Sequence, residues 1–560
     1  MSDGGSGGST AGPFETMAMP LDATGVPNLD LVLGGGLRRG SLMLLVGPPG
    51  SGKTTLATQM AFAAAATDRR VLVLAALSEP VSKLLQHLRT YRFFDEAVVG
   101  DRLRMHSLQQ FLPQGLASTG REIAAIVRAE RAGLVVLDGF RGLREGDGGA
   151  QLVRQFLYDL GTALSLQGAT TVITTEGEAH DQGFYQEATT ADTIVALEAA
   201  RGIMRSVRWL EVIKARGAAP LTGRHGITIG AAGVAVHPRL EARVAAETQP
   251  ARAAETLVPD QRLASFGQDD LDAIFGGGLA RATTTLVMGG LGTGKTLFGL
   301  HYAVAGALAQ QPTVFLSLRE DERQLRRKAA AFDLGRRLGA ALEPGGGLTL
   351  LRRPAVELDI ELLADELLAT LDQSGARRLV VDSMIEWERA VGEGSDPRRV
   401  PNHLAALVEA LQTRAITSLL IRESGIASAR SDLDLPIDAL SATVENVVWL
   451  HQVADRQRVH RVLSVPKTRY APSDGTRHEF VIEAPAGIRV VGAYRSDHGV
   501  LDAIADQEAA SPFGMPSSGG GGGGTGPASV DPAGVPASPA TEAVASAAEA
   551  SDRKATRGDS

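Results

Sequence analysis

The chain contains two copies of one phosphate-binding sequence, and this repeat restricts the fold more than any other feature. The segment GPPGSGKT at 47–54 returns as GGLGTGKT at 289–296, and both match the pattern G-x-x-x-x-G-K-[ST]. A GGGL turn precedes each copy, at 34–37 and again at 276–279. A repeat of about 240 residues is too long for one unit of a solenoid. The sequence therefore predicts a tandem duplication of one whole domain.

Short apolar runs alternate with helix-like stretches inside each copy. In the first copy, LMLLVG (42–47) and ATTVITTE (169–176) are rich in strand-forming residues, and KTTLATQMAFAAAA (53–66) is typical of a helix. Apolar runs of this length fit strands that are buried on both faces of a parallel sheet. The alternation predicts an α/β fold with a mainly parallel sheet flanked by helices. The later segments GITIG (226–230) and GVAVH (233–237) predict a small antiparallel extension.

Changes in composition place the domain boundaries. Residues 1–18 are rich in Gly and Ser, and we predict a disordered N-terminal tail. The two domains are predicted at 19–240 and 261–495, joined by a linker at 241–260. Residues 496–560 contain a run of six glycines and few apolar residues. Such a segment cannot bury enough surface to fold, so we predict a second disordered, low-complexity tail.

Charge and cysteine content exclude several classes of protein. The chain has no cysteine, which excludes disulfides, thiolate metal sites and cysteine nucleophiles. Its formal net charge is −8, so we expect no nucleic-acid partner. The N-terminus MSDGGSGGSTAGPF lacks the basic and apolar regions of a signal peptide, and no apolar run approaches the ~18 residues of a membrane span. We therefore expect a cytoplasmic protein without a membrane partner.

The two phosphate-binding motifs carry the groups that hold a nucleotide with Mg²⁺. Glycines let successive backbone N–H groups surround phosphate oxygens, and the helix that follows adds the positive end of its dipole. The lysine would reach the β- and γ-phosphates, and the next residue would bind Mg²⁺ through its hydroxyl. The predicted nucleotide-binding residues are Gly47, Gly50, Ser51, Gly52, Lys53, Thr54 and Thr55 in the first copy, and Gly289, Gly292, Thr293, Gly294, Lys295, Thr296 and Leu297 in the second.

An aspartate ends one apolar strand in each copy. LVVLDG contains Asp138, and RLVVDS contains Asp382. A carboxylate at the carboxyl end of such a strand lies beside the phosphate loop and can hold Mg²⁺ through water. An aspartate there could also cap the next helix. Because both copies place the residue alike, we predict one magnesium site at Thr54 and Asp138 and another at Thr296 and Asp382.

Together these features resemble the KaiC family, which includes a circadian clock ATPase. The resemblance covers about residues 20–495 and rests on the GGGL turns, the TTE strand end at 174–176 and LEVIKARGAAPLTGRHGITIGAAGVAVHP at 210–238. It implies two tandem RecA-like P-loop NTPase domains that bind ATP with Mg²⁺. It also implies a hexameric ring of two stacked tiers, with ATP between subunits, and a protein signalling partner.

The resemblance also assigns cations that act between subunits. In the family, a lysine and an arginine on a late strand reach the γ-phosphate of the neighbouring subunit. Here they would be Lys214 and Arg216, and VLSVPKTRYAP places Lys467 and Arg469 in the same way, with Tyr470 where the family has glycine. Two cations at i and i+2 on a strand share one face, as such a role requires. A solvated basic edge strand is the alternative.

Hydrolysis depends on acids at the end of the second strand of each copy. The family has two adjacent glutamates there, one of which activates the attacking water. This chain has Ser78 followed by Glu79, and Arg319 followed by Glu320. One carboxylate can still act, since general-base assistance of ~10²–10⁴-fold needs one placed group. Arg319 would weaken Glu320 or pair with it. We expect slow ATP hydrolysis through Glu79 and slower or no hydrolysis through Glu320.

Other interpretations stay open at this point. Glu320, Asp321 and Glu322 could simply favour the start of a helix. The second domain of the family can phosphorylate its own Ser/Thr pair, of which this chain keeps Ser441 followed by an alanine. A weak Ser/Thr autokinase and a non-hydrolysing nucleotide-binding scaffold are therefore alternatives, and Ser441 could instead cap a short helix. The acidic charge argues against a DNA motor.

Overall fold

The computed structural model describes residues 20–75, 80–111, 116–140, 149–177, 189–201, 206–251, 263–394, 397–424, 439–455, 458–470 and 475–494. The tails that the sequence predicts to be disordered, at 1–18 and 496–560, lie outside these residues, and so does Glu79. In the part of the chain that is described, no helix is long and apolar enough to cross a membrane.

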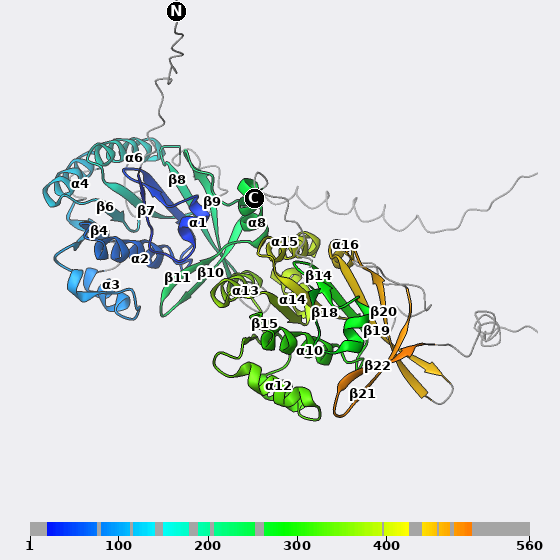
Figure 1. Cartoon of the computed structure of the whole chain (residues 1–560). Helices are drawn as coiled ribbons and strands as arrows, with labels where there is room; N and C mark the ends of the chain where they lie inside the picture. The colour runs from blue at the N-terminus through cyan, green and yellow to red at the C-terminus, as the bar shows by residue number, and fades with distance from the viewer. Residues whose placement is uncertain are drawn as a thin grey trace, which may run out of the picture. The chain divides into compact units, whose positions relative to one another are not determined.

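The first lobe is built on a nine-stranded mixed sheet (Figure 1). Six strands run parallel: β3 (Leu42–Gly47), β4 (Val71–Ala75), β5 (Leu103–Ser107), β6 (Leu134–Leu137), β7 (Thr170–Glu176) and β8 (Thr193–Arg201). Three antiparallel strands extend the sheet beyond β8: β9 (Ser206–Ala215), β10 (Arg224–Gly230) and β11 (Gly233–His237). The strand order β11-β10-β9-β8-β3-β7-β6-β4-β5 places β3 near the centre.

Helices cover both faces of this sheet, as the continuous apolar strands require. On one side lie α2 (Lys53–Ala66) and α3 (Val81–Leu88), and on the other lie α4 (Leu116–Glu130) and α6 (Gly149–Leu166) (Figure 1). Strand β4 shows the division, because Val71 and Val73 belong to the core on one face and Leu72 and Leu74 to the core on the other. The short helix α1 (Leu29–Leu33) and the β1–β2 pair (Leu21–Asp22, Leu37–Arg38) precede β3.

The second lobe repeats the plan with the strand order β16-β15-β17-β18-β14-β19-β20-β21-β22. Its parallel strands are β14 (Thr284–Gly289), β15 (Thr313–Ser317), β16 (Leu348–Arg352), β17 (Arg378–Asp382), β18 (Thr417–Glu423) and β19 (Asn446–Asp455). The antiparallel extension is β20 (Arg458–Lys467), β21 (His478–Glu483) and β22 (Gly487–Ala493). The pair β12–β13 (Leu263–Ala264, Leu279–Ala280) matches β1–β2.

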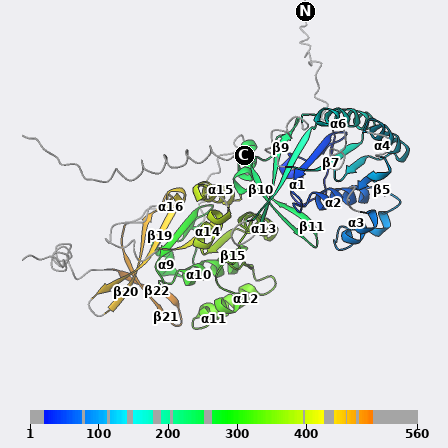
Figure 2. The same ribbon diagram turned by 180° about the vertical axis from the view of Figure 1, so that it is seen from behind.

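Helices also cover both faces of the second sheet (Figure 2). One core contains side chains of α10 (Lys295–Leu308), α11 (Glu322–Ala329) and α12 (Asp333–Leu342), together with α9 (Asp269–Ile274). The other contains side chains of α13 (Ile360–Ser374), α14 (Met384–Gly394), α15 (Val400–Thr413) and α16 (Ala439–Thr443). Two tandem α/β domains with mainly parallel sheets are the fold class that the sequence predicts, and this prediction is confirmed.

The segment predicted as a linker contains a helix, α8 (Leu240–Ala251). Leu240 and Val244 are buried in the core of α13 to α15. At its start, Glu241 accepts two hydrogen bonds of 2.6 Å from Arg399. Burial alone would raise the pKa of Glu241, but hydrogen bonds from His403 and Arg399 and their charges hold it far below its usual range. This part of the linker is therefore attached to the second lobe.

Candidate nucleotide-binding sites

Each phosphate loop connects a central strand to a buried helix. In the first lobe the loop joins β3 to α2, and in the second it joins β14 to α10. Gly52 and Gly294 cap these helices in the left-handed region, at φ 101° and 95°. A Cβ atom on Gly52 would lie 2.6 Å from Ile229 Cδ1, and one on Gly294 would lie 2.8 Å from Ile482 Cδ1. The positive φ favours glycine at both positions, and a larger residue would also displace the end of the isoleucine side chain.

The loop lysines point back into their own loops. Lys53 Nζ donates to the carbonyls of Gly47 and Pro48 at 2.8 and 2.9 Å, and Lys295 Nζ donates to those of Gly289 and Gly290 at 2.9 and 2.6 Å. Burial lowers the pKa of both lysines, and nearby carboxylates oppose that shift. In each lobe the ammonium is therefore held inside the loop that would surround the phosphates.

The predicted magnesium ligands come together in both lobes. Thr54 Oγ1 lies 3.1 and 3.0 Å from the two carboxylate oxygens of Asp138, and Thr296 Oγ1 donates to Asp382 Oδ2 at 2.7 Å. Both aspartates are buried. Hydroxyl and carboxylate oxygens are ligands that Mg²⁺ prefers, with phosphate oxygens and water completing its shell. The donor set therefore fits a magnesium ion bound together with a nucleotide.

Metal clusters of another kind were not found in the described part of the chain, where no group of three or more His, Cys, Asp or Glu side chains converges. Burial raises the pKa of Asp382, the hydrogen bond from Thr296 opposes this, and the negative charge of Glu320 adds to the rise. A bound cation would offset that electrostatic cost.

Both loops open into cavities that contain residues the sequence reasoning missed. The cavity in the first lobe has a volume of about 510 Å³ and that in the second about 350 Å³. Tyr91 lines the first and Phe332 the second. Each aromatic residue comes twelve positions after the strand-end glutamate, Glu79 or Glu320, so their spacing could have identified them. Their rings could contact a nucleobase.

Two strand-end carboxylates were also missed as site residues. Glu176 ends β7 and Glu423 ends β18, and each lines the cavity of its own lobe. Their charges raise the pKa of Lys53 and Lys295, against the effect of burial. An acid at the end of a buried strand is itself a sequence signal, and it could have identified both residues.

Acids at the end of β15 have separate roles. Asp321 forms a capping box with Gln324, in which each side chain accepts a 2.8 Å hydrogen bond from the other's backbone N–H. Glu322 lies in the first turn of α11 and pairs with Arg326 at 2.7 Å. The helix-start interpretation is therefore confirmed for Asp321 and Glu322. Glu320 lies outside the cap and lines the cavity.

The predicted pairing of Arg319 with Glu320 is wrong. Arg319 instead pairs with Glu386 at 2.5 Å and with Glu423 at 2.6 Å. The reason is the strand order, in which β17 lies beside β15 and β18 lies beside β17. Glu386 is on α14, which follows β17, and Glu423 ends β18. The partner of Glu320 is Lys328, whose ammonium forms a close ion pair with Oε1. The sequence reasoning did not consider Lys328.

The candidate inter-subunit cations lie away from the phosphate loop of their own lobe. Lys214 is in register with Ile194 near the start of β8, and Lys467 with Val447 near the start of β19. This is the amino-terminal edge of the parallel strands, whereas the phosphate loops follow the carboxyl ends of β3 and β14. The structure thus does not bring these lysines to a phosphate site within one chain.

Backbone carbonyls hold these cations at that edge. Lys214 and Arg216 each donate to the carbonyl of Thr189 at 3.1 Å. Lys467 donates to three carbonyls at the end of α16, including that of Ser441 at 3.0 Å. Ser441 is an interior residue of α16 and is 9% exposed, so it does not cap the helix. The hydroxyl that was considered as a phosphate acceptor is therefore largely shielded in this conformation.

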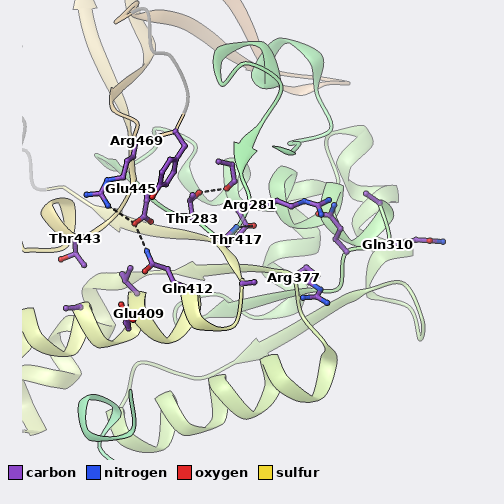
Figure 3. Close-up of a pocket in the computed structure, with 18 residues that line it drawn as sticks. Arg281, Thr283, Gln310, Arg377, Glu409, Gln412, Thr417, Thr443, Glu445 and Arg469 are labelled. Atoms are coloured by element: carbon purple, nitrogen blue, oxygen red, sulfur yellow. Dashed lines mark hydrogen bonds and ion pairs between the residues drawn. The ribbon is translucent and has the colours of Figure 1, made fainter. Parts of the chain in front are cut away.

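A third cavity, of about 990 Å³, lies at the same edge of the second sheet. Figure 3 shows Arg469 and Gln412 on opposite sides of Glu445, to which both are joined by dashed lines. The distances are 3.9 Å from Arg469 to Glu445 and 2.8 Å from Gln412 to Glu445. Arg469 lines this cavity and is held by this long ion pair, whereas Lys467 makes three hydrogen bonds.

Comparisons with known proteins agree with this geometry. A family model described as "ATPase: KaiC" matches residues 23–241 and again 265–494. The circadian clock oscillator protein KaiC of Parathermosynechococcus lividus is 22% identical over 498 residues, which cover 86% of this chain and 87% of that protein. Circadian clock protein KaiC3 of Synechocystis sp. is 24% identical over 511 residues, covering 87% and 95%. The KaiC oscillator protein of Synechococcus elongatus is 24% identical over 485 residues, covering 84% and 88%.

Proposed function

This chain belongs to the KaiC ATPase family, and from that premise we propose that it is a signalling ATPase that forms an ATP-dependent hexameric ring and hydrolyses ATP slowly, mainly in its first lobe. The observation that carries the proposal is the repeated site geometry. In both lobes a loop lysine, a threonine hydroxyl and a strand-end aspartate occupy equivalent places around a cavity. The relatives are named as circadian clock proteins, which supports a signalling role with a protein partner.

Nucleotide binding would use the phosphate loops and the two threonine–aspartate pairs. Backbone N–H groups of each loop would surround the phosphates, and Lys53 and Lys295 would leave their carbonyl partners for phosphate oxygens. Thr54 with Asp138, and Thr296 with Asp382, would hold Mg²⁺. When bound, the ion would neutralise phosphate charge. Tyr91 and Phe332 are placed to contact the base.

The positions of the cations support ring assembly. Lys214 and Arg216 lie at the opposite end of the sheet from the phosphate loop of their own lobe, and we assign them to a triphosphate bound on another copy. A contact between two different edges of identical subunits is heterologous, and such contacts generate closed rings when the rotation closes. Lys467 and Arg469 would act likewise in the second tier, and all four cations would stabilise γ-phosphate charge in trans.

We assign different rates of hydrolysis to the two lobes. We assign Glu79 as the base of the first lobe from the sequence, since it lies outside the described residues. Glu320, its counterpart, is in an ion pair with Lys328. This pairing is a reason to assign slower hydrolysis to the second lobe. It also favours a second candidate function, a scaffold in which nucleotide only holds the ring together.

Native mass spectrometry with and without ATP tests the assembly. We expect six copies and nucleotide in both lobes with ATP, and smaller species without it. A phosphate-release assay then separates the ATPase from the scaffold, using Glu79→Gln as the base-deficient variant. Slow release that falls on this substitution supports the ATPase. Release that is absent from the wild type supports the scaffold, and release that Glu79→Gln leaves unchanged refutes the assignment of Glu79.

A further inference from the structure

Lys328 reaches from the last turn of α11 back to the end of β15. Its ammonium pairs with Oε1 of Glu320, although the lysine side chain is 47% exposed and could extend into solvent. The other carboxylate oxygen, Oε2, is buried and has no hydrogen-bond partner in the described part of the chain. One oxygen is thus occupied by a cation and the other is enclosed. The carboxylate is therefore engaged with Lys328 and not directed at a water molecule in the cavity.

The backbone around Glu320 is fixed by other contacts. Ser317 Oγ donates to the Glu320 carbonyl at 2.7 Å and accepts from the Glu320 N–H at 3.1 Å. The guanidinium of Arg352 donates to the carbonyls of Leu318 and Arg319, both at 3.1 Å. With the main chain held in this way, only side-chain rotation can change where the Glu320 carboxylate points. Its ion pair with Lys328 therefore determines that direction.

The first lobe has no lysine at the equivalent place. Lys328 follows Glu320 by eight positions, and the residue eight positions after Glu79 is His87. His87 lies in the last turn of α3, where its ring packs edge-on against Tyr91 with 5.6 Å between centroids. The histidine side chain is shorter than that of lysine, and its ring is already in contact with Tyr91. A lysine eight positions after the glutamate is thus particular to the second lobe.

Lys328 and Glu320 both line the second nucleotide cavity, together with Lys295 and Asp382. From this geometry we infer that Lys328 is a positioning residue, which holds the Glu320 carboxylate in an ion pair and so keeps the second site occupied by unhydrolysed nucleotide. The inference rests on the proposed ATPase function and names the cause of the difference between the lobes. It assigns that cause to Lys328 and not to Arg319, which pairs with Glu386 and Glu423.

The test measures phosphate release by full-length protein in a Glu79→Gln background, where first-lobe hydrolysis is suppressed. Lys328→Met keeps the aliphatic length and removes the charge. We expect it to raise release about tenfold, a part of the ~10²–10⁴-fold that a general base supplies. Lys328→Arg restores the cation and should keep release low. Adding Glu320→Gln to Lys328→Met should abolish the gain.

Arg326→Met is the matched control, because Arg326 lies on the same helix and pairs with Glu322 instead. We expect it to leave release unchanged. A purely structural role for Lys328 would produce a loss of activity or stability, not a gain that depends on Glu320. No gain in Lys328→Met, or a gain that survives Glu320→Gln, overturns the inference. Failure of the proposed function is read separately, from phosphate release by the chain with Glu79 intact.

Discussion

Thr296 Oγ1 lies 2.7 Å from Asp382 Oδ2, although 86 residues separate them in the sequence. Thr54 and Asp138 repeat this relationship in the first lobe, across 84 residues. In each case the threonine is the second residue of the helix after the phosphate loop. The aspartate follows β6 or ends β17, and each of these strands lies two places from the phosphate-loop strand in its sheet. A hydroxyl and a carboxylate paired at this point are poised to share a metal ion, and the pair gives the first prediction.

Asp382→Asn should weaken the magnesium dependence of nucleotide binding. The carboxylate would orient the metal through water, and loss of such a partner typically weakens metal affinity by roughly 10–100-fold. We expect a fluorescent ATP analogue to bind wild-type protein much more tightly with Mg²⁺ than with a chelator, and this difference to shrink in the variant. Asp138→Asn tests the first lobe. Asp68→Asn, at an exposed loop position paired with Arg102, is the control that should behave as wild type.

Much of this site could be predicted because its signals are local. The phosphate loops are contiguous motifs, and an aspartate at the end of a buried strand can be recognised from the sequence alone. Lys328 and the partners of Arg319 are different. Glu386 and Glu423 lie 67 and 104 residues from Arg319, and they meet it only because β17 and β18 follow β15 in the sheet. The sequence does not give the strand order, so it favours the adjacent residue, Glu320, as the partner of Arg319.

The candidate inter-subunit cations are a second case in which the sequence does not determine where side chains lie in the fold. The i, i+2 spacing of Lys214 and Arg216 predicts that they share a face, but not which end of the sheet they occupy. The register of β9 with β8 settles that point. Similarly, the sequence predicts a linker after the first domain, but not that Leu240 and Val244 are buried against the second lobe, because their burial depends on helices more than a hundred residues later.

Tyr91→Ala should reduce nucleotide affinity in the first lobe. The ring lines the cavity beside the phosphate loop, and loss of a base–aromatic contact costs about 1–3 kcal/mol. This corresponds to roughly 5–150-fold weaker binding. Equilibrium titration with a fluorescent ATP analogue measures it, in a Lys295→Ala background that weakens the second site. Tyr91→Phe keeps the ring and should retain affinity. Equal weakening in both variants would show that the hydroxyl, not the ring, is required.

Mixing two inactive variants should restore hydrolysis. Arg216→Ala removes the cation that we assign in trans, and such cations are worth about 10³–10⁵-fold in rate. Glu79→Gln removes the base but leaves Arg216. In a mixed ring, a chain with an intact base can receive the arginine of its Glu79→Gln neighbour, so phosphate release should exceed that of either variant alone. Release that equals the average of the two separate samples would mean that Arg216 acts on its own chain or not at all.

His301→Gln should remove a loss of stability at mildly acidic pH. His301 is buried on α10, where its Nε2 accepts from the Ile488 N–H at 3.5 Å. Burial lowers its pKa to about 4, Arg337 adds to the effect, and Asp270 opposes it. The unfolded chain, with its histidine near pKa 6.5, binds the proton more readily than the folded one. The stability that depends on the neutral ring is therefore complete above pH 6.5 and declines as the pH falls towards 4. Between pH 7 and 5 the loss should be about 2 kcal/mol.

Gln59, at the equivalent position of the first lobe, already bonds both backbone groups of Val234 without a titrating ring. Urea unfolding followed by tryptophan fluorescence should therefore show a smaller pH dependence in His301→Gln than in wild type, and an unchanged dependence would exclude His301 as its source.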